Sequence, residues 1–411
     1  MEIKQFISRV RHSLYLKNIL TVAFGTSIAQ FFPILLLPII SRIYIPEDYG
    51  EYALFVSIVG IIAIFVTGHY NYAIMLPKET EAAVALMDIS FSINIVVSSM
   101  VFCGSLIYSF VSQKFIYILI PLPVFIAGMN TMLSIWNNRS KNYKIISASN
   151  VLSGILVPCL QIGLFFFMGG KGLIIAYIIS QLLVCIFLLI KTSNLHLHLV
   201  NYKNNISLLY RYRSFVYQKL PSAINNSLAV QLPTFLMTSF VGAIPTGNFN
   251  FSNRLLGVPL QLLSSSIGEV FKQSAIESKH KDGNCKRIFI KTLLLLSSIA
   301  LPIFIILLLF APQIFSIVFG TAWSEAGHYV QILCLLFFVR FVVSPLSYVL
   351  IAVERLGEDL FIQILKMVLS VIGLVCGYLV YRTPEGMLLF YMTGYFLAYI
   401  YEFFRSYVAS L

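Results

Sequence analysis

The sequence carries little charge for its length. Only 11% of its 411 residues are Asp, Glu, Lys or Arg, whereas 59% are hydrophobic and the mean hydropathy is +0.88. Soluble domains contain about 25% charged and about 45–50% apolar residues. An apolar excess of this size cannot be buried in a water-soluble core. The composition therefore excludes a soluble enzyme, a disordered chain and a secreted disulfide scaffold.

Motifs for catalysis, phosphate binding and metal binding are missing as well. The sequence contains no P-loop, GxSxG or HExxH pattern, and none of its six cysteines forms a CxxC pair. Five of these cysteines lie within apolar runs, where reduced and buried thiols are expected. We therefore expect no enzymatic activity, no cofactor and no metal site.

Long apolar runs are abundant, and about 20 such residues span a bilayer as a helix. The runs do not alternate as membrane β-strands would, so helices are expected. The sequence predicts twelve spans, near residues 18–41, 52–74, 86–110, 115–136, 145–168, 172–191, 220–241, 250–271, 291–311, 327–352, 360–381 and 386–406.

Basic residues are distributed unequally between the segments that join these spans. With the N-terminus inside, inner segments hold 21 of the 28 Lys and Arg residues, and outer loops hold four. Cytoplasmic loops are enriched in Lys and Arg, so both termini are predicted to be cytoplasmic. The net charge of +12 is then a topology signal, and no nucleic-acid partner is needed to explain it.

An internal repeat accompanies the division of the spans into six and six. Gly50 and Gly247 are each followed by an aromatic residue two positions later and by another glycine ten positions later, at an offset of 197 residues. We expect both to be structural turn residues that permit close packing or a positive φ. The predicted fold is an all-α polytopic membrane protein of about twelve helices. Its two six-helix lobes, residues 1–205 and 206–411, would be parallel repeats around a central cavity.

Charged residues inside the predicted spans are candidates for a binding site, because charge is costly within a bilayer. Arg254, Arg340 and Lys366 are all cationic, which favours an anionic substrate, phosphate above all. For Lys366, snorkelling to the interface explains the position equally well. No comparably deep acid is expected. Asp88 and Glu269, nearer the cytoplasmic ends, are weak candidates for ion coupling.

Neutral amides form a second group of candidates. Asn225, Asn226 and Gln231 are the densest such cluster and lie between Pro221 and Pro233. Amides offer donors and acceptors that suit the hydroxyl and acetamido groups of sugars, so these residues could line a glycan site. The alternative is that they form hydrogen bonds between helices.

Three segments resemble those of a known family. Residues 42–52 resemble the Pro-x-Asp-Tyr-Gly-x-Tyr signature of bacterial polysaccharide flippases, and residues 254–259 and 319–333 are also similar to that family. The chain thus resembles Wzx-type O-antigen flippases of the multidrug/oligosaccharidyl-lipid/polysaccharide exporter superfamily, whose fold is MATE-like. The resemblance implies a protein of the bacterial cytoplasmic (inner) membrane. It would flip an undecaprenyl-pyrophosphate-linked oligosaccharide, an O-antigen or related repeat unit, to the periplasmic leaflet by alternating access.

The resemblance also implies partners: membrane lipids, a proton or sodium gradient and the polysaccharide polymerase machinery. Two other functions stay open. A cation-coupled multidrug exporter of the same fold would favour acidic residues in its lobes, whereas the deep charges here are positive. A membrane-embedded glycan polymerase or ligase would need a large outer loop. The longest outer loop, near 311–326, has one acid, Glu325, and no basic residue.

Overall fold

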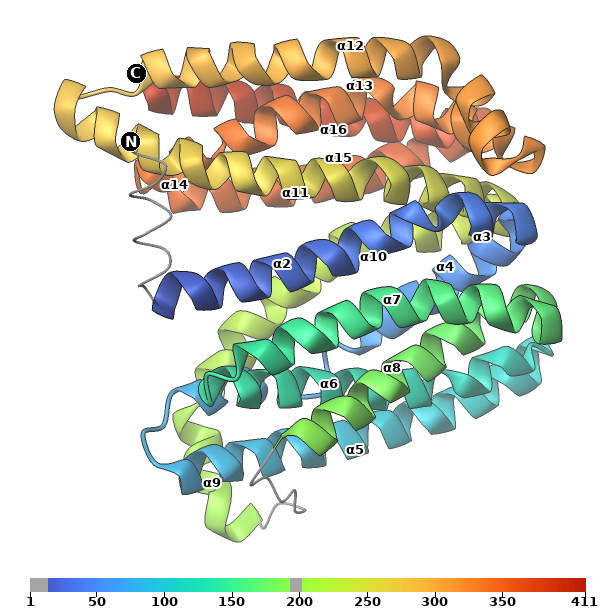
Figure 1. Ribbon diagram of the computed structural model, residues 1–411, viewed down its shortest axis with the longest axis vertical. Coiled ribbons are helices and arrows are strands. Elements are labelled where there is room, and N and C mark those ends of the chain that lie inside the picture. Colours follow the sequence, from blue (N-terminus) through green and yellow to red (C-terminus); the bar gives the residue numbers. More distant parts are fainter. Residues whose placement is uncertain (1–13, 193–201) are drawn as a thin grey trace. The chain divides into compact units, whose positions relative to one another are not determined.

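The protein is all-helical in the residues that the computed structural model describes, 14–192 and 202–411, which contain no strand (Figure 1). Lys4, Arg9 and Arg11, which count among the inner basic residues, lie outside these ranges. The helices are α2 (Leu14–Leu35), α3 (Leu37–Ile43), α4 (Pro46–Ile62), α5 (Thr80–Ser112), α6 (Pro121–Arg139), α7 (Tyr143–Met168), α8 (Gly172–Lys191), α9 (Tyr202–Arg211), α10 (Leu220–Val241), α11 (Ala243–Asp282), α12 (Lys286–Phe319), α13 (Ser324–Leu346), α14 (Tyr348–Ala352), α15 (Leu356–Tyr381) and α16 (Pro384–Ser410).

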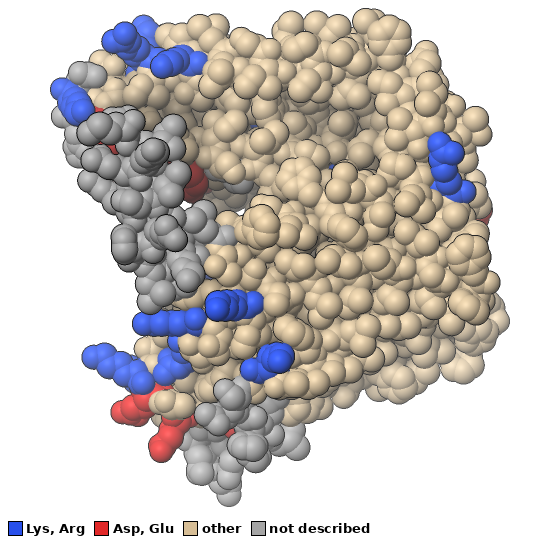
Figure 2. Space-filling model, in the orientation of Figure 1, with Lys and Arg blue, Asp and Glu red and all other residues tan. Residues whose placement is uncertain are grey.

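The surfaces of these helices are suited to lipid. Eight helical segments among the described residues are long and apolar enough to cross a membrane. The longest helices expose large apolar side chains, as Leu294, Ile303 and Leu309 do on α12. On the face shown in Figure 2, charged side chains gather at helix ends and other residues cover the surface between them. The chain is therefore a multi-pass membrane protein. The count of twelve spans stays a prediction.

The second predicted span, 52–74, differs from the structure. Helix α4 ends at Ile62, and the chain turns before the short 3-10 helix η1 (Tyr70–Met75). Gly68 and His69 have φ angles of 53° and 60°, in the left-handed region that residues other than glycine rarely enter. Apolar composition continues through this segment, so hydropathy alone does not reveal that the helix is interrupted.

The described helices fall into two compact units. One comprises the chain up to Ile40 together with Phe55–Gln231, and the other comprises Ser41–Leu54 and Leu232–Leu411. In the first unit, α7 packs against α2 and α8, and α6 packs against α5 and α8. In the second, α13 packs against α11, α12 and α16, and α15 packs against α16. Ser41–Leu54, early in the chain, thus belongs with the C-terminal helices. The predicted lobe boundary at 205/206 stays a prediction.

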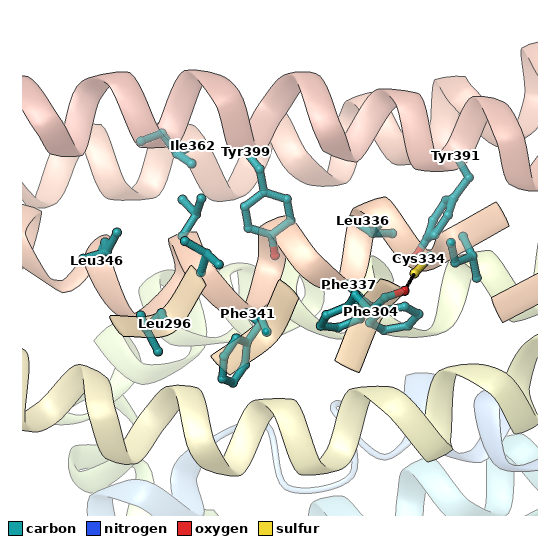
Figure 3. Packing of buried hydrophobic residues seen from close by; sticks show 14 of the residues in the cluster. Leu296, Phe304, Cys334, Leu336, Phe337, Phe341, Leu346, Ile362, Tyr391 and Tyr399 are labelled. Atoms are coloured by element: carbon teal, nitrogen blue, oxygen red, sulfur yellow. Dashed lines mark hydrogen bonds between the residues drawn. The ribbon is translucent and has the colours of Figure 1, made fainter. Parts of the chain in front are cut away.

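Large apolar side chains form the core of the second unit, and α13 supplies many of them (Figure 3). Phe337 and Phe341 are almost fully buried in it. Tyr391 and Tyr399 point from α16 into the same core (Figure 3). The Cys334 thiol donates a hydrogen bond of 3.1 Å to the carbonyl of Phe304. This core holds α13 against α16.

The cysteines are only partly placed as the sequence predicts. All six are free thiols, and Cys185, Cys285 and Cys334 are buried. Cys103 and Cys159 are instead exposed, on α5 and α7. In a membrane protein an apolar run does not imply burial in protein, because lipid accepts small apolar side chains as well as a core does.

Helices α15 and α16 pack at unusually short range. Gly373 and Gly377 on α15 face α16, and a β-carbon added to Gly373 would lie 2.5 Å from the carbonyl oxygen of Phe390. One added to Gly377 would overlap the carbonyl oxygen of Gly386. Gly373 and Gly377, spaced as in a GxxxG pattern, therefore form a helix-packing face. This close approach brings long polar side chains of the two helices together.

Candidate functional site

Four residues on one face of α16 form a polar row in which Tyr391, Tyr399 and Glu402 are buried and Tyr395 is half-buried. Tyr391, Tyr395 and Tyr399 are spaced four apart and Glu402 follows three residues later, so all four lie on the same side of the helix. Neighbouring tyrosine rings have centroids 5.0 and 6.1 Å apart. Tyr391 is 7% and Tyr399 4% exposed. We call Tyr391, Tyr395 and Tyr399 the tyrosine column.

Lys366 of α15 joins this row at its Glu402 end. Its ammonium nitrogen lies 2.7 Å from Oε2 of Glu402, and the two side chains are 16% and 3% exposed. The same nitrogen is 4.2 Å from the ring centroid of Tyr399, within cation–π range. The Glu402 carboxylate also interacts with Ser347, whose hydroxyl donates a hydrogen bond of 2.9 Å to the carbonyl of Ser344. Glu402 is therefore a buried acid that the sequence analysis did not single out, and Lys366 has an ion-pair partner within the second unit. The expected depths of these residues in the membrane stay predictions.

Arg340 of α13 approaches the tyrosine column from another helix. Its side chain is half-buried, and its guanidinium interacts electrostatically with all three phenol groups. The column thus collects a guanidinium from α13, an ammonium from α15, and three hydroxyls and a carboxylate from α16. Guanidinium, ammonium and phenol groups all donate hydrogen bonds, so the set is chemically suited to bind oxyanions.

Arg254 lies in a different part of the second unit. Its Nη1 atom donates to the hydroxyl of Tyr49 at 3.0 Å. The buried Tyr49 ring packs edge-on against Phe251 and Trp323, with centroids 5.6 and 5.7 Å away. The Trp323 indole N–H donates to the carbonyl of Ser41 at 2.7 Å. The three family-like segments therefore converge in one packed cluster, and Arg254 is part of it.

Gly50 and Gly247 meet where α4 and α11 cross. A β-carbon on Gly50 would overlap the carbonyl oxygen of Ala243, and one on Gly247 would overlap that of Pro46. Ala243 follows Pro46 by the same 197 residues that separate the glycines, so the contact is reciprocal, as at a two-fold axis. Both glycines lie near the starts of helices rather than in the turns between them. Close packing explains why glycine is there.

The amide candidates belong to the first unit, whereas the tyrosine column belongs to the second. On α10, Asn225 is half-buried and Asn226 is exposed. Gln231 covers Gly60, and a β-carbon there would lie 2.7 Å from its Nε2 atom. Gln231 thus has a packing contact of its own.

The two acidic candidates lie in different units. Asp88 is half-buried on α5 in the first unit. Glu269 is exposed on α11 in the second unit, where it interacts electrostatically with Tyr348. Of the cationic residues predicted from the sequence, the structure brings Arg340 and Lys366 to one place. It places Arg254 elsewhere.

The sequence analysis missed Glu402 and the tyrosine column. A signal was present, because a repeat of polar-tipped residues at positions i, i+4, i+8 and i+11 within an apolar span marks one helical face. Neither the abundance of tyrosine nor the distance of Glu402 from the end of the last predicted span reports which side of a helix faces the protein.

Comparisons with known proteins agree with this architecture. A family model described as polysaccharide biosynthesis protein matches residues 39–328. None of the curated proteins matches the sequence. An inward-facing multidrug resistance MATE family transporter of the MOP superfamily is 15% identical, covers 94% of each chain and has a TM-score of 0.66. The lipid II flippase MurJ, in an inward closed conformation, is 13% identical, with 93% of this chain and 89% of that chain covered and a TM-score of 0.68.

A third similar structure is a MOP superfamily transporter from Pyrococcus furiosus, described as having a binding pocket of reverse polarity. It is 13% identical, with 95% of this chain and 94% of that chain covered and a TM-score of 0.53. At these identities the likeness is one of fold. The predicted all-α, MATE-like polytopic fold is thereby confirmed.

Proposed function

The chain belongs to the family of polysaccharide biosynthesis proteins, and from this premise we propose that it transports a lipid-linked oligosaccharide across a membrane. The substrate is an undecaprenyl-pyrophosphate-linked O-antigen or related repeat unit. The protein moves it from the cytoplasmic to the periplasmic leaflet by alternating access. The fold shared with MurJ, described as a lipid II flippase, supports this choice.

The observation that carries the proposal is the pairing of Arg340 and Lys366 with the tyrosine column. A pyrophosphate diester presents several oxygens and two negative charges. A guanidinium can hold two of those oxygens at once, and phenol hydroxyls and an ammonium can donate to others. Arg254 and the amides Asn225, Asn226 and Gln231 are further candidates for contacts with the headgroup or its sugars.

The setting follows from the charge distribution. We place the protein in the bacterial inner membrane with both termini in the cytoplasm, because the inner segments carry most Lys and Arg residues. A proton or sodium gradient would supply energy, with Asp88 and Glu269 as candidate coupling residues. Polysaccharide polymerase machinery would then consume the exported unit.

A multidrug exporter is the second candidate, because the chain also shares the fold of a multidrug resistance MATE transporter. Such exporters take cationic, lipophilic substrates. The two cations at the tyrosine column outnumber its single carboxylate, so this site repels cations and attracts anions. The net positive charge at the tyrosine column therefore favours a flippase for an anionic lipid over an exporter of cationic drugs.

A leaflet assay tests the function directly. In a strain lacking the gene, lipid-linked repeat units should accumulate on the cytoplasmic face and return to the periplasmic face when the protein is restored. Susceptibility to cationic drugs is measured in the same strains. Normal periplasmic delivery without the gene, or drug sensitivity as the only phenotype, would contradict the flippase.

A further inference from the structure

Two ion pairs connect α15 to α16, and they differ in burial. Arg405 lies 2.8 Å from Glu358, and their side chains are 37% and 31% exposed. The Lys366–Glu402 pair is far less exposed. Two charges removed from water lose hydration that their mutual attraction only partly returns, so a buried pair is weak evidence for stability. The glycine contacts and the partly exposed pair already hold these helices together. The buried pair therefore invites a functional explanation.

At the tyrosine column itself the charges do not balance. Arg340 and Lys366 contribute two positive charges, and Glu402 contributes one negative charge that is paired with Lys366. Asp359, two turns before Lys366 on α15, also interacts electrostatically with the Glu402 carboxylate. Arg340 interacts with phenols instead. Glu402 thus occupies the position at Lys366 that an external anionic group would take.

We propose that Glu402 is a specificity-determining residue, a resident counter-ion that the anionic headgroup of the substrate must displace from Lys366. The proposal rests on the function proposed above and concerns the selection of a pyrophosphate. Ser347, which follows α13, interacts with the carboxylate, and its hydroxyl can turn from the Ser344 carbonyl to donate to the carboxylate when Lys366 is released.

Displacement discriminates between headgroups by their charge. The phosphodiester of an ordinary phospholipid carries one negative charge, as Glu402 does, so exchanging one for the other gains little Coulomb energy. A pyrophosphate diester carries two and can neutralise Lys366 and Arg340 together. Glu402 thereby keeps abundant membrane phospholipids out of the site while admitting the pyrophosphate. Proteins commonly gain specificity from a group that disfavours binding of the wrong ligand, and here Glu402 disfavours the phospholipid.

The test compares pyrophosphate binding by purified full-length wild type, Glu402→Gln and Glu358→Gln in detergent micelles. Calorimetry measures binding of inorganic pyrophosphate, with and without phosphatidylglycerol in the micelles. Glu358→Gln is the matched control, because it removes the other ion pair between the same helices. We expect wild type and the control to bind pyrophosphate with little effect of the lipid.

For Glu402→Gln we expect pyrophosphate affinity to rise about tenfold, because Lys366 has lost its internal partner. Phosphatidylglycerol should then reverse most of that gain by competing for the site. Unchanged or weaker pyrophosphate binding by a folded Glu402→Gln protein overturns the proposal. If that variant does not fold, Glu402→Asp, which keeps the charge on a shorter side chain, should raise the affinity several-fold. An unchanged affinity there also overturns it.

Failure of this inference is distinguishable from failure of the proposed function. A wild type that binds pyrophosphate and passes the leaflet assay, beside a Glu402→Gln protein with the same affinity and lipid response, leaves the flippase standing and removes Glu402 from the selection. A wild type that binds no pyrophosphate and does not restore periplasmic delivery removes both.

Discussion

At the scale of single residues, the ionisable groups inside helices separate into bound and available ones. Lys366 already has a carboxylate at 2.7 Å, and Arg254 donates to Tyr49. Arg340 has phenols as its electrostatic partners, which are neutral at physiological pH and do not cancel its charge. Arg254 likewise interacts with neutral phenols, those of Tyr49 and Tyr52. At the tyrosine column, where Lys366 is paired with Glu402, Arg340 is therefore the cation best prepared to take an external anion.

Substitutions of Arg340 distinguish a phosphate-binding role from a structural one. Arg340→Lys should keep partial export, about a tenth of wild type, because charge survives while the two-pronged donor is lost. Arg340→Ala should abolish export at normal membrane abundance. Export is measured by the leaflet assay and abundance by immunoblotting of membranes.

The control is Arg340→Gln, which keeps hydrogen-bond donors without charge. If Arg340 serves only to hold helices together, this variant should export at the wild-type level, and Arg340→Ala should lower abundance. Full export by Arg340→Gln at normal abundance would falsify the assignment of Arg340 to the headgroup.

The sequence pointed to Arg340 and Lys366 but not to Glu402, and the reasons are physical. Arg340 and Lys366 stand out because a charge within an apolar run is costly wherever its side chain points. Glu402 does not stand out, since its distance from the end of α16 is compatible with the interface. Its partner is on another helix, so the pair depends on which faces of α15 and α16 meet. That choice is made by the contacts of Gly373 and Gly377, which local pattern alone does not reveal.

At the scale of elements, hydropathy located most helices but did not show that the second predicted span is interrupted. The predicted second span ran through Ile62, where α4 ends, to residue 74. The segment between α4 and α5 is irregular, and Arg139 at the end of α6 helps to hold it in place. The Arg139 guanidinium donates hydrogen bonds to the carbonyls of Ile74 and Pro77, at 3.0 and 2.6 Å. Such contacts satisfy backbone groups that a continuous helix would satisfy itself. They link distant residues, so hydropathy along the chain does not report them.

The crossing of α4 and α11 gives a sharper expectation for the repeat glycines than the sequence alone. Gly50→Ala and Gly247→Ala should each lower thermal stability, by about 1–3 kcal/mol for an overpacked contact, because the first added carbon already meets a backbone carbonyl. Valine should be worse at both positions. Melting of the purified protein in detergent, followed by intrinsic fluorescence, measures the effect.

Gly104→Ala is the matched control, since a β-carbon there meets no atom within 4 Å. The reciprocal geometry requires Gly50 and Gly247 to respond alike. Tolerance of valine at both sites would remove the structural meaning of the repeat, and a response at one site alone would remove its reciprocity.

At the scale of the whole molecule, the order of helices in the second half repeats that of the first. Two long helices, α7 and α8, follow α6, and likewise α15 and α16 follow α13. The short 3-10 helix η2 (Phe115–Leu119) precedes α6, and η5 (Thr321–Trp323) precedes α13. In the second half the short helix α14 lies between α13 and α15. The duplication expected from the two glycines stays a prediction. The cavity between lobes predicted from the sequence stays a prediction.

Membrane topology is the whole-molecule property that both the repeat and the basic residues predict. Reporter fusions after residues 45, 113, 170, 242, 320 and 383, all at or beside helix boundaries, should report the periplasm. Fusions after 78, 141, 284 and 354 should report the cytoplasm. Lys and Arg gather near 141 and 284, and the alternation of sides from one predicted span to the next places 78 and 354 on the same side. The pairs 45 and 242, and 113 and 320, occupy corresponding positions of the two halves. Parallel repeats with an even number of spans in each require both members of a pair to lie on the same side. A periplasmic signal at 45 beside a cytoplasmic one at 242 would show inverted halves. The reciprocal glycine contact would then not mark a two-fold axis along the membrane normal.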